Sequence, residues 1–235
     1  LKEECDEINE VFFHYITTGT PFVVMKYAMT ADGRIATKTG ASKWITGEKA
    51  RENVHRSRLK YSAIMVGVGT VLKDDPMLTC RIENGRNPTR ILCDSHLRTP
   101  LTSQIVKSAE TVPTIIATCS SDEKSISEYE KRGCSVLRTS PQNGRVDLKS
   151  LMKRLGELKI DSVLLEGGGE LNFSAFGEGI VHKIECYIAP KVFGGKEAKS
   201  PVEGMGVRVP EEAFLLNEPK VSFFGEDILI EWRVR

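Results

Sequence analysis

The segment from residue 162 to residue 171 constrains the fold more than any other part of the chain. A short apolar run, residues 162–165, ends at Glu166; three consecutive glycines follow, and a helical pattern begins. A strand that turns through glycines into a helix exposes backbone N–H groups at the positive end of the helix dipole. This arrangement predicts a cradle for a phosphate or pyrophosphate. Glu166 would lie at the carboxyl end of the strand, where open α/β sheets place their chemistry.

A second glycine turn, at Gly67 and Gly69, follows the apolar run 63–66. Two such turns in one chain suggest a dinucleotide that lies across a sheet. Neither turn completes the usual dinucleotide fingerprint, because Leu72 and Asn172 stand where a third glycine belongs. The first predicted strand also lacks a glycine turn. We therefore expect dinucleotide binding on a fold other than the standard Rossmann arrangement.

Apolar runs alternate with helical patterns through most of the chain. Runs that are β-branched and do not alternate predict buried, mainly parallel strands in an α/β fold. The tail differs, because two apolar runs flank Gly225-Glu226-Asp227 and predict a hairpin of antiparallel strands. The expected strands are 22–28, 63–66, 90–93, 114–118, 135–137, 162–165, 183–189, 221–224 and 228–232, and the expected helices are 4–17, 47–60, 122–131 and 146–158.

The composition excludes several partners and chemistries. A formal net charge of +1 gives no reason to expect nucleic acid or a membrane surface. No apolar run approaches the roughly 20 residues that cross a bilayer, and the acidic N-terminus does not resemble a signal peptide. The six cysteines form no C-x-x-C pair and no histidine pair has zinc spacing, which predicts a reduced, cytoplasmic protein without a metal. A P-loop and a G-x-S-x-G elbow are both missing from the sequence.

Several polar residues stand in positions that each allow two interpretations. Lys26 lies in an apolar strand, so its ammonium must reach the surface or meet a partner, because a buried bare ammonium is costly. Arg58 ends a predicted helix, where solvation or pairing with the helix dipole is the simpler interpretation. Trp44 fits a core as well as a ligand site, residues 74–76 fit a surface turn, and Arg81 has no distinguishing context.

Taken together, these residues fall in ordered motifs. The motifs are residues 26–36 (KYAMTADGRIA), 40–46 (GASKWIT), 67–81 (GVGTVLKDDPMLTCR), 94–95 (DS), 166–169 (EGGG) and 189–195 (APKVFGG). In this order they resemble the riboflavin-biosynthesis reductase family, and above all the C-terminal reductase domain of its bacterial bifunctional deaminase/reductases. The resemblance runs from about Pro21 to the end of the chain.

The resemblance implies a dihydrofolate-reductase-like α/β sandwich in three layers. It implies reduction of 5-amino-6-(5-phosphoribosylamino)uracil by NADPH, which opens the ribose to a ribityl chain. Residues 1–20 would form a linker helix after a deaminase domain, and residues 21–235 would form the reductase domain. The zinc motif of such deaminases, H-x-E with P-C-x-x-C, is missing here, so the chain resembles the reductase part of a longer protein. The resemblance also implies a homodimer, formed through the late antiparallel strands.

Carried over by position, the resemblance assigns roles to individual residues. Lys26 and Glu166 would be catalytic, with Lys26 donating to or orienting the sugar hydroxyls and Glu166 fixing the ammonium. The substrate would be held by Ser42, Arg58, Leu78, Arg81 and Glu166, with the two arginines on the 5′-phosphate. NADPH would be lined by Ala28, Trp44, Thr46, Thr70, Asp74 and Ser95, and its pyrophosphate by Gly168, Gly169, Glu170, Leu171, Asn172, Phe173 and Ser174.

Two alternatives stay open. The same scaffold could reduce the undeaminated diaminopyrimidine or a pterin, or the chain could be a non-catalytic NADPH-binding module, against which the retained Lys26 and Glu166 argue. The residue that reads the 2′-phosphate of NADPH is also open, with Ser95, Ser120 and Lys124 as candidates. The motifs depart little from the family, which often has a leucine in place of Ala31, a difference that we expect to alter packing rather than chemistry.

Overall fold

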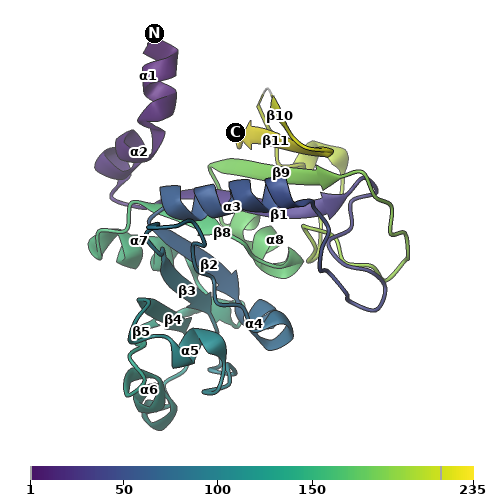
Figure 1. Cartoon of the computed structure of the whole chain (residues 1–235). Helices are drawn as coiled ribbons and strands as arrows, with labels where there is room; N and C mark the ends of the chain where they lie inside the picture. The colour runs from purple at the N-terminus through teal and green to yellow at the C-terminus, as the bar shows by residue number, and fades with distance from the viewer. Residues whose placement is uncertain (1, 218) are drawn as a thin grey trace. The chain divides into compact units, whose positions relative to one another are not determined.

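The structure is a computed structural model that describes residues 2–217 and 219–235. The chain forms two compact units, each built from two stretches of sequence. The first unit holds the chain up to Val23 together with Arg58–Leu164, and the second holds Val24–Ser57 together with Leu165–Arg235. Figure 1 labels the helices and strands of both.

The first unit is built on parallel strands. Its strands are β2 (Ala63–Gly67), β3 (Thr89–Cys93), β4 (Thr114–Thr118), β5 (Ser135–Arg138) and β8 (Ser162–Leu165), with a small hairpin of β6 (Pro141–Gln142) and β7 (Arg145–Val146). The strand order is β8-β2-β3-β4-β5, and β2–β3, β3–β4 and β4–β5 pair in parallel. Four of these strands, β2, β3, β4 and β8, are almost wholly buried, as their unalternating apolar runs predict.

The first unit also contains helices. They are α1 (Lys2–Ile8), α2 (Glu10–Thr18), α4 (Val68–Asp74), α5 (Gln104–Lys107), α6 (Glu123–Glu130) and α7 (Leu148–Glu157). The core joins Ile64, Leu92 and Ile116 of three strands to Ile105 and Val106 of α5. The predicted helices 122–131 and 146–158 are α6 and α7, which begin after the capping carboxylates of Asp122 and Asp147. We did not predict the short helices α4 and α5, since each has too few residues to show a helical period.

The sequence predicts a single helix over residues 4–17, but the structure has two helices there, α1 and α2. They are separated at Asn9, whose backbone angles (φ −100°, ψ 12°) leave the helical region. Asparagine favours helix ends because its side chain competes for backbone groups. The apolar positions Ile8 and Phe12 are 83% and 58% exposed. The Tyr15 hydroxyl, by contrast, donates a 3.0 Å hydrogen bond to the Gly156 carbonyl and anchors α2.

The second unit contains the mixed strands. Its elements are β1 (Phe22–Thr30), α3 (Glu48–Lys60), α8 (Gly169–Gly177), β9 (Lys183–Ala189), the 3₁₀ turn η1 (Pro210–Glu212), β10 (Lys220–Phe224) and β11 (Asp227–Arg233). The strand order is β10-β11-β9-β1; β1 and β9 are parallel, and the other two pairs are antiparallel. Figure 1 shows β9, β11 and β10 side by side at the green-to-yellow end of the chain. The predicted C-terminal hairpin is confirmed, and Gly225 supplies its left-handed turn (φ +69°).

Helix α3 covers one face of these strands. Its Ala50 and Val54 pack on Tyr187 of β9 and Leu229 of β11. Because side chains of a strand alternate between faces, Tyr187 shares its face with Glu185, and the parallel register places Lys26 of β1 opposite Glu185. A small group of polar side chains is thus embedded in an apolar layer.

The predicted fold class is confirmed: an α/β structure with mainly parallel strands and antiparallel strands at its C-terminal end. Cys93, Cys134 and Cys186 are buried free thiols, as expected of cysteines in apolar runs. Within the described parts of the chain, no helix combines the length and the hydropathy that a bilayer crossing requires.

Candidate active site

Lys26 and Glu166 form an ion pair in the second unit. β1 carries Lys26 near the middle of the strand, and Glu166 is the first residue after β8. The Lys26 Nζ lies 3.9 Å from Glu166 Oε2, and the two side chains are only 14% and 13% exposed. This distance is longer than a hydrogen bond. Of the two interpretations of Lys26, the structure supports the one in which the ammonium meets a partner.

Several polar side chains of the same unit surround the Lys26 end of the pair. The Lys26 ammonium is 5.7 Å from the ring centroid of Tyr187, and the Tyr187 hydroxyl accepts a 2.8 Å hydrogen bond from Asn53 Nδ2. Glu185 is 5% exposed and accepts a 2.8 Å hydrogen bond from Ser57 Oγ. We did not single out these residues in the sequence. The signal was present, because Glu185 is a charge within an apolar run, as Lys26 is.

The glycine turn after Glu166 adopts the predicted strand-to-helix form. Gly168 (φ −81°, ψ 171°) precedes α8, and no side chain caps this helix. A Cβ on Gly167 would lie 2.7 Å from Asn172 Oδ1 and one on Gly169 would lie 2.5 Å from Glu203 Cγ, whereas one on Gly168 would have nothing within 4 Å. Gly167 and Gly169 are therefore required by close packing, and Gly168 faces open space.

Asn172 is held inside the same turn. It is fully buried, and its Nδ2 donates a 2.8 Å hydrogen bond to the Pro201 carbonyl. Its Oδ1 has no hydrogen-bond partner among the residues that the structure describes. Gly169 is buried, while Leu171, Phe173 and Ser174 are half-buried along α8 and Glu170 is exposed in its first turn.

The segment with Ser42, Trp44 and Thr46 is held by two cations. Lys191 Nζ donates to the carbonyls of Ile45 (2.6 Å) and Trp44 (3.1 Å). Arg51 donates a 2.8 Å hydrogen bond to the Thr46 carbonyl, and its guanidinium lies 4.7 Å from the Trp44 ring centroid. Trp44 is 59% exposed, so its interpretation as a core residue is wrong. Ser42 is half-buried and Thr46 is buried.

The strand that carries Lys26 continues into a loop fixed by Asp32. The Asp32 carboxylate accepts hydrogen bonds from Thr30 Oγ1 (2.5 Å) and from the backbone N–H groups of Phe193 (3.1 Å) and Gly194 (2.7 Å). These bonds, that of Thr30 first, lower the pKa of Asp32 to about 2. These bonds connect the motif at residues 26–36 with the motif at residues 189–195. Ala28, also on β1, packs against the Tyr187 cluster.

The first unit holds the predicted phosphate-binding residues. Arg58 Nη1 donates a 3.0 Å hydrogen bond to the Thr79 carbonyl, which brings Arg58 to the segment that contains Leu78 and Arg81. Leu78 is buried with a left-handed backbone (φ +53°), and Arg81 is exposed. Arg58 lies in the last turn of α3, as predicted, and its contact with the Thr79 carbonyl shows that its guanidinium is not simply solvated.

Thr70, Asp74 and Ser95 also lie in the first unit. Thr70 and Asp74 are both on α4, one turn apart, and both are half-buried. Ser95 follows β3, and its Oγ accepts a 3.1 Å hydrogen bond from the Val146 N–H. Thr118 connects Ser95 with Ser120, because its Oγ1 donates to the Ser95 carbonyl and accepts from the Ser120 N–H.

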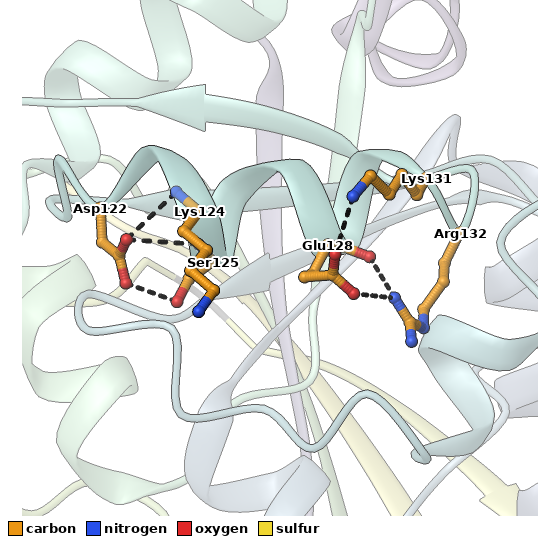
Figure 2. A network of polar contacts seen from close by, with 6 residues as sticks. All are labelled: Asp122, Lys124, Ser125, Glu128, Lys131 and Arg132. Carbon is orange, nitrogen blue, oxygen red and sulfur yellow. Dashed lines mark hydrogen bonds and ion pairs between the residues drawn. The ribbon is translucent and has the colours of Figure 1, made fainter.

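Lys124, the third candidate for the 2′-phosphate, lies on α6 behind a carboxylate cap. Figure 2 shows Asp122 at the start of this helix, where it accepts hydrogen bonds from the N–H groups of Lys124 (3.1 Å) and Ser125 (3.3 Å). These bonds, and above all that from the Ser125 hydroxyl, lower the pKa of Asp122. At the other end of α6, Glu128 pairs with Lys131 and Arg132. The N-terminal N–H groups of α6 thus already have an anionic partner.

In the ranges that the structure covers, no three His, Cys, Asp or Glu side chains come together to hold a metal ion. The second unit offers an ammonium–carboxylate pair, an uncapped helix N-terminus and an exposed indole held by cations. Such groups can bind a phosphorylated or dinucleotide ligand and move a proton.

Comparison with known proteins decides the family. The model of the RibD C-terminal domain matches residues 21–230. The chain belongs to the RibD C-terminal domain family. The resemblance seen in the motifs is therefore confirmed.

Relatives of this RibD-type domain are found in bacteria and archaea. The riboflavin biosynthesis protein RibD of Actinobacillus pleuropneumoniae is 54% identical over 234 residues, which are 100% of this chain and 62% of that protein. The 2,5-diamino-6-ribosylamino-4(3H)-pyrimidinone 5′-phosphate reductase of Methanothermobacter thermautotrophicus is 38% identical over 219 residues, 92% of this chain and 99% of that protein. The chain thus spans about 62% of the bacterial relative's length and nearly the whole of the archaeal one.

Solved structures of RibD proteins share the fold. The Thermotoga maritima diaminohydroxyphosphoribosylaminopyrimidine deaminase/5-amino-6-(5-phosphoribosylamino)uracil reductase matches with a TM-score of 0.82 and 34% identity, over 100% of this chain and 62% of that one. Acinetobacter baumannii RibD matches with a TM-score of 0.84 and 28% identity, over 98% of this chain and 62% of that one.

Proposed function

We propose that this chain is an NADPH-dependent reductase of riboflavin biosynthesis that converts the ribosyl group of 5-amino-6-(5-phosphoribosylamino)uracil to ribityl. The observation that carries the proposal is the Lys26–Glu166 pair, 3.9 Å apart and mostly buried, immediately before the glycine turn into α8. The reductase names of the relatives support it.

The glycine turn fits the pyrophosphate of a nicotinamide dinucleotide. The first N–H groups of an uncapped helix have no partner within the helix, α8 has no side-chain cap, and Gly168 leaves room for a ligand to approach the backbone. Gly168–Ser174 would hold the pyrophosphate, and Ala28, Trp44, Thr46, Thr70, Asp74 and Ser95 would contact the rest of the cofactor. When bound, the reduced nicotinamide supplies a hydride to the substrate carbon.

Preference for NADPH over NADH is part of the proposal. Among the three candidate residues, Ser95 and Ser120 are linked through Thr118 at the ends of β3 and β4. Lys124 stands next to the Asp122 carboxylate on α6. A phosphate at that helix end would meet a negative charge, so we favour Ser95 and Ser120 for the 2′-phosphate.

The residues of the chain would act on the sugar. Ring opening breaks the C1′–O4′ bond and forms a C1′=N imine; the nitrogen loses its proton and O4′ takes one up, so this step consumes no net proton. Reduction then places a hydride on C1′ and a proton on the nitrogen, so the reaction consumes one NADPH and one proton. Lys26 would be the proton donor, to O4′ or to the nitrogen, and the charge of Glu166 would stabilise its ammonium.

Other residues would hold the 5′-phosphate and the remainder of the substrate. Arg58 and Arg81 are suited to the 5′-phosphate, because a guanidinium binds phosphate oxygens in a bidentate manner. Leu78, which precedes Arg81 closely in sequence, and Ser42 would contact the remainder of the substrate.

A second candidate substrate is the undeaminated 2,5-diaminopyrimidine. It is favoured by the archaeal relative, whose name specifies that substrate and of which this chain spans 99% at 38% identity. The pyrimidine differs in one exocyclic group, an amine in place of a carbonyl oxygen. An enzyme assay distinguishes the two candidates.

The deciding experiment follows NADPH oxidation by absorbance under anaerobic conditions. The diaminopyrimidine is supplied with or without a separate deaminase, and NADH replaces NADPH in a parallel sample. Oxidation only with deaminase supports the uracil substrate, and oxidation without it supports the second candidate. Absence of oxidation in both samples, with NADPH still quenching the tryptophan fluorescence, contradicts both substrates but not cofactor binding.

The proposal also covers a fused deaminase domain, the oligomeric state and the cellular location. The bacterial relatives are longer than this chain, which spans 62% of their length, and this supports fusion to a deaminase domain. A homodimer is supported by Val221 and Phe223 on the edge strand β10, which are 50% and 71% exposed, because exposed apolar edges are usually covered. Native mass spectrometry that finds only monomer would contradict it. A cytoplasmic location agrees with the buried free thiols.

A further inference from the structure

We infer that Asn87 is a positioning residue for the substrate, and that its side chain holds the backbone beside Arg81, one of the two arginines proposed for the 5′-phosphate. The inference rests on the proposed function, which assigns Arg58 and Arg81 to that phosphate. Asn87 itself lies outside the motifs that carry the family resemblance, and its contact in the folded chain is what points to this role.

The segment of residues 77–90, which leads from α4 into β3, folds back on itself. At its base, Nη1 of the fully buried Arg90 donates a 3.2 Å hydrogen bond to the Met77 carbonyl. Nearer the tip, the Cys80 N–H donates a 3.0 Å hydrogen bond to Asn87 Oδ1. Each bond joins one side of the segment to the other, as in a hairpin. The Asn87 side chain thus does what a backbone carbonyl does in a regular pair of strands.

Arg81 lies between two of these cross-links. Asn87 holds Cys80, which precedes Arg81, and the carbonyl of Ile82, which follows it, accepts a 2.9 Å hydrogen bond from the Gly85 N–H. The Arg81 side chain is exposed, so the backbone on either side sets where its guanidinium can reach. The hydrogen bond between Cys80 and Asn87 therefore helps to fix the position of the Arg81 Cα.

The backbone of Asn87 is itself anchored to the sheet. Pro88, the next residue, is buried, and a residue before proline is restricted to extended backbone. Thr89 then begins β3, and its N–H donates a 2.9 Å hydrogen bond to the carbonyl of Ser62, which directly precedes β2. Asn87 thus extends from a backbone that the sheet fixes, and its hydrogen bond transmits this position to Cys80.

The same segment also contacts Arg58. Its Nη1 donates a 3.0 Å hydrogen bond to the carbonyl of Thr79, the neighbour of Cys80. Leu78 is buried with a left-handed backbone (φ +53°), which a non-glycine residue keeps only where the surrounding structure holds it. The segment therefore connects the guanidinium of Arg58 to the backbone of Arg81. Such pre-organisation lowers the entropic cost of binding one phosphate with both side chains.

The test begins with Asn87→Leu, because leucine has nearly the shape of asparagine but accepts no hydrogen bond. The position is exposed, so the protein is expected to fold. We expect the KM for the phosphoribosylaminopyrimidine to rise about fivefold, the effect of one ordinary hydrogen bond, while kcat and the Kd for NADPH stay within about twofold of wild type. Both candidate pyrimidines carry the same 5′-phosphate, so the expectation holds for either.

The matched control is Asn217→Leu. Asn217 is also exposed, and its Oδ1 also accepts one hydrogen bond, at 2.9 Å from Arg235 Nε. We expect this variant to keep the wild-type KM. If Asn87→Leu does not fold, Asn87→Ala takes its place with the same expectations, since it removes the same acceptor and adds no apolar surface.

A double-mutant cycle shows whether Asn87 acts through Arg81. In an Arg81→Ala background the guanidinium is gone, so we expect Asn87→Leu to change the KM by less than about twofold there. A residue that merely stabilises the fold would have the same effect with and without Arg81.

A further measurement needs no reductase activity. In protein labelled with nitrogen-15, we expect the Cys80 amide to exchange its hydrogen at least about fivefold faster in Asn87→Leu than in wild type, because its acceptor is lost. The amides of β3 are expected to keep their rates, which shows that the sheet is intact. Asn217→Leu is expected to leave the exchange of Cys80 unchanged.

Three results would overturn the inference: a folded Asn87→Leu protein with the wild-type KM, one with the wild-type exchange rate of Cys80, or an equal change of KM with and without Arg81. A wild-type protein without reductase activity contradicts the proposed function instead. The exchange rate of Cys80 then still decides whether Asn87 holds this backbone.

Discussion

The ammonium of Lys191 lies 2.6 Å from the carbonyl oxygen of Ile45 and so ties the loop after β9 to the segment that precedes α3. Arg51 holds the same segment from α3, through the Thr46 carbonyl and the face of Trp44. Trp44 is 59% exposed, so these cations, rather than burial in a core, determine its position. The proposed contacts of Trp44 and Thr46 with the cofactor therefore depend on two charged side chains.

Lys191→Met is expected to weaken NADPH binding about three- to tenfold, because an exposed hydrogen bond to a charged group contributes less than the roughly 1.5–3 kcal/mol typical of such bonds. The emission of Trp44 should also shift before cofactor is added, and a Trp232→Phe background isolates it, since the chain has 2 tryptophans. Fluorescence titration measures both effects. Lys196→Met, at an exposed position of the same loop, is the control. Unchanged emission and affinity would show that Lys191 does not order the segment.

Lys26→Met is expected to lower kcat by about 10²–10⁴, the usual contribution of a positioned acid or base, while NADPH affinity changes little. Glu166→Gln keeps the shape of its side chain but removes the charge, and it should lower kcat by a smaller factor. Stopped-flow single turnovers with both variants measure the effect on the chemical step. Lys43→Met, an exposed lysine in a neighbouring segment, serves as the control. Wild-type turnover in Lys26→Met would remove Lys26 from the mechanism.

Arg58→Ala is expected to raise the substrate KM about 10- to 100-fold, which corresponds to the roughly 1.5–3 kcal/mol of a hydrogen bond to a charged group. Arg56→Ala is a matched control one half-turn earlier on α3, because Arg56 is exposed and paired with Glu52 at 2.9 Å. Steady-state kinetics at saturating NADPH compares the two. Equal KM values for both variants would place the phosphate elsewhere.

Gly168→Ala and Gly169→Ala are expected to have opposite effects. The Cβ at position 168 would enter open space, so we expect an unchanged melting temperature but NADPH affinity reduced about tenfold, since the methyl occupies the proposed pyrophosphate approach. The Cβ at position 169 would lie 2.5 Å from Glu203 Cγ, and this overpacking should cost about 1–3 kcal/mol of stability. Thermal unfolding and NADPH titration distinguish the two. Full affinity in Gly168→Ala would contradict the proposed cradle.

Asp32→Asn is expected to destabilise the protein in a pH-dependent manner. The folded pKa of about 2 is below the unfolded value of about 3.9, so the Asp32 carboxylate contributes stability that is fully present above pH 4. This contribution is lost as the pH falls through the folded pKa. The difference in urea midpoint between wild type and Asp32→Asn should therefore be constant near neutral pH and shrink below about pH 4. A difference independent of pH would contradict the role of the charge.

Much of the fold could be predicted from local pattern. The buried strands β2, β4 and β8 followed from short β-branched runs, and α6 and α7 followed from helical periodicity after an aspartate cap. The break at Asn9 could not be predicted with the same assurance. Whether an asparagine interrupts a helix depends on what packs against it, and in α2 the anchoring contact is made to Gly156, 141 residues away from Tyr15.

The sequence alone determined the fold class, the family and the set of residues to examine, because glycine turns, apolar runs and ordered motifs are local properties of a chain. Only the tertiary structure decided whether each ambiguous residue meets a specific partner or simply lies in solvent or in the core. Lys26 meets Glu166 instead of solvent, Trp44 is exposed and held by Arg51 and Lys191, and Tyr187 lies beneath the ammonium. The physical reason is that the cost of burying a charge or a ring is set by its neighbours, and these come from segments far apart in the sequence.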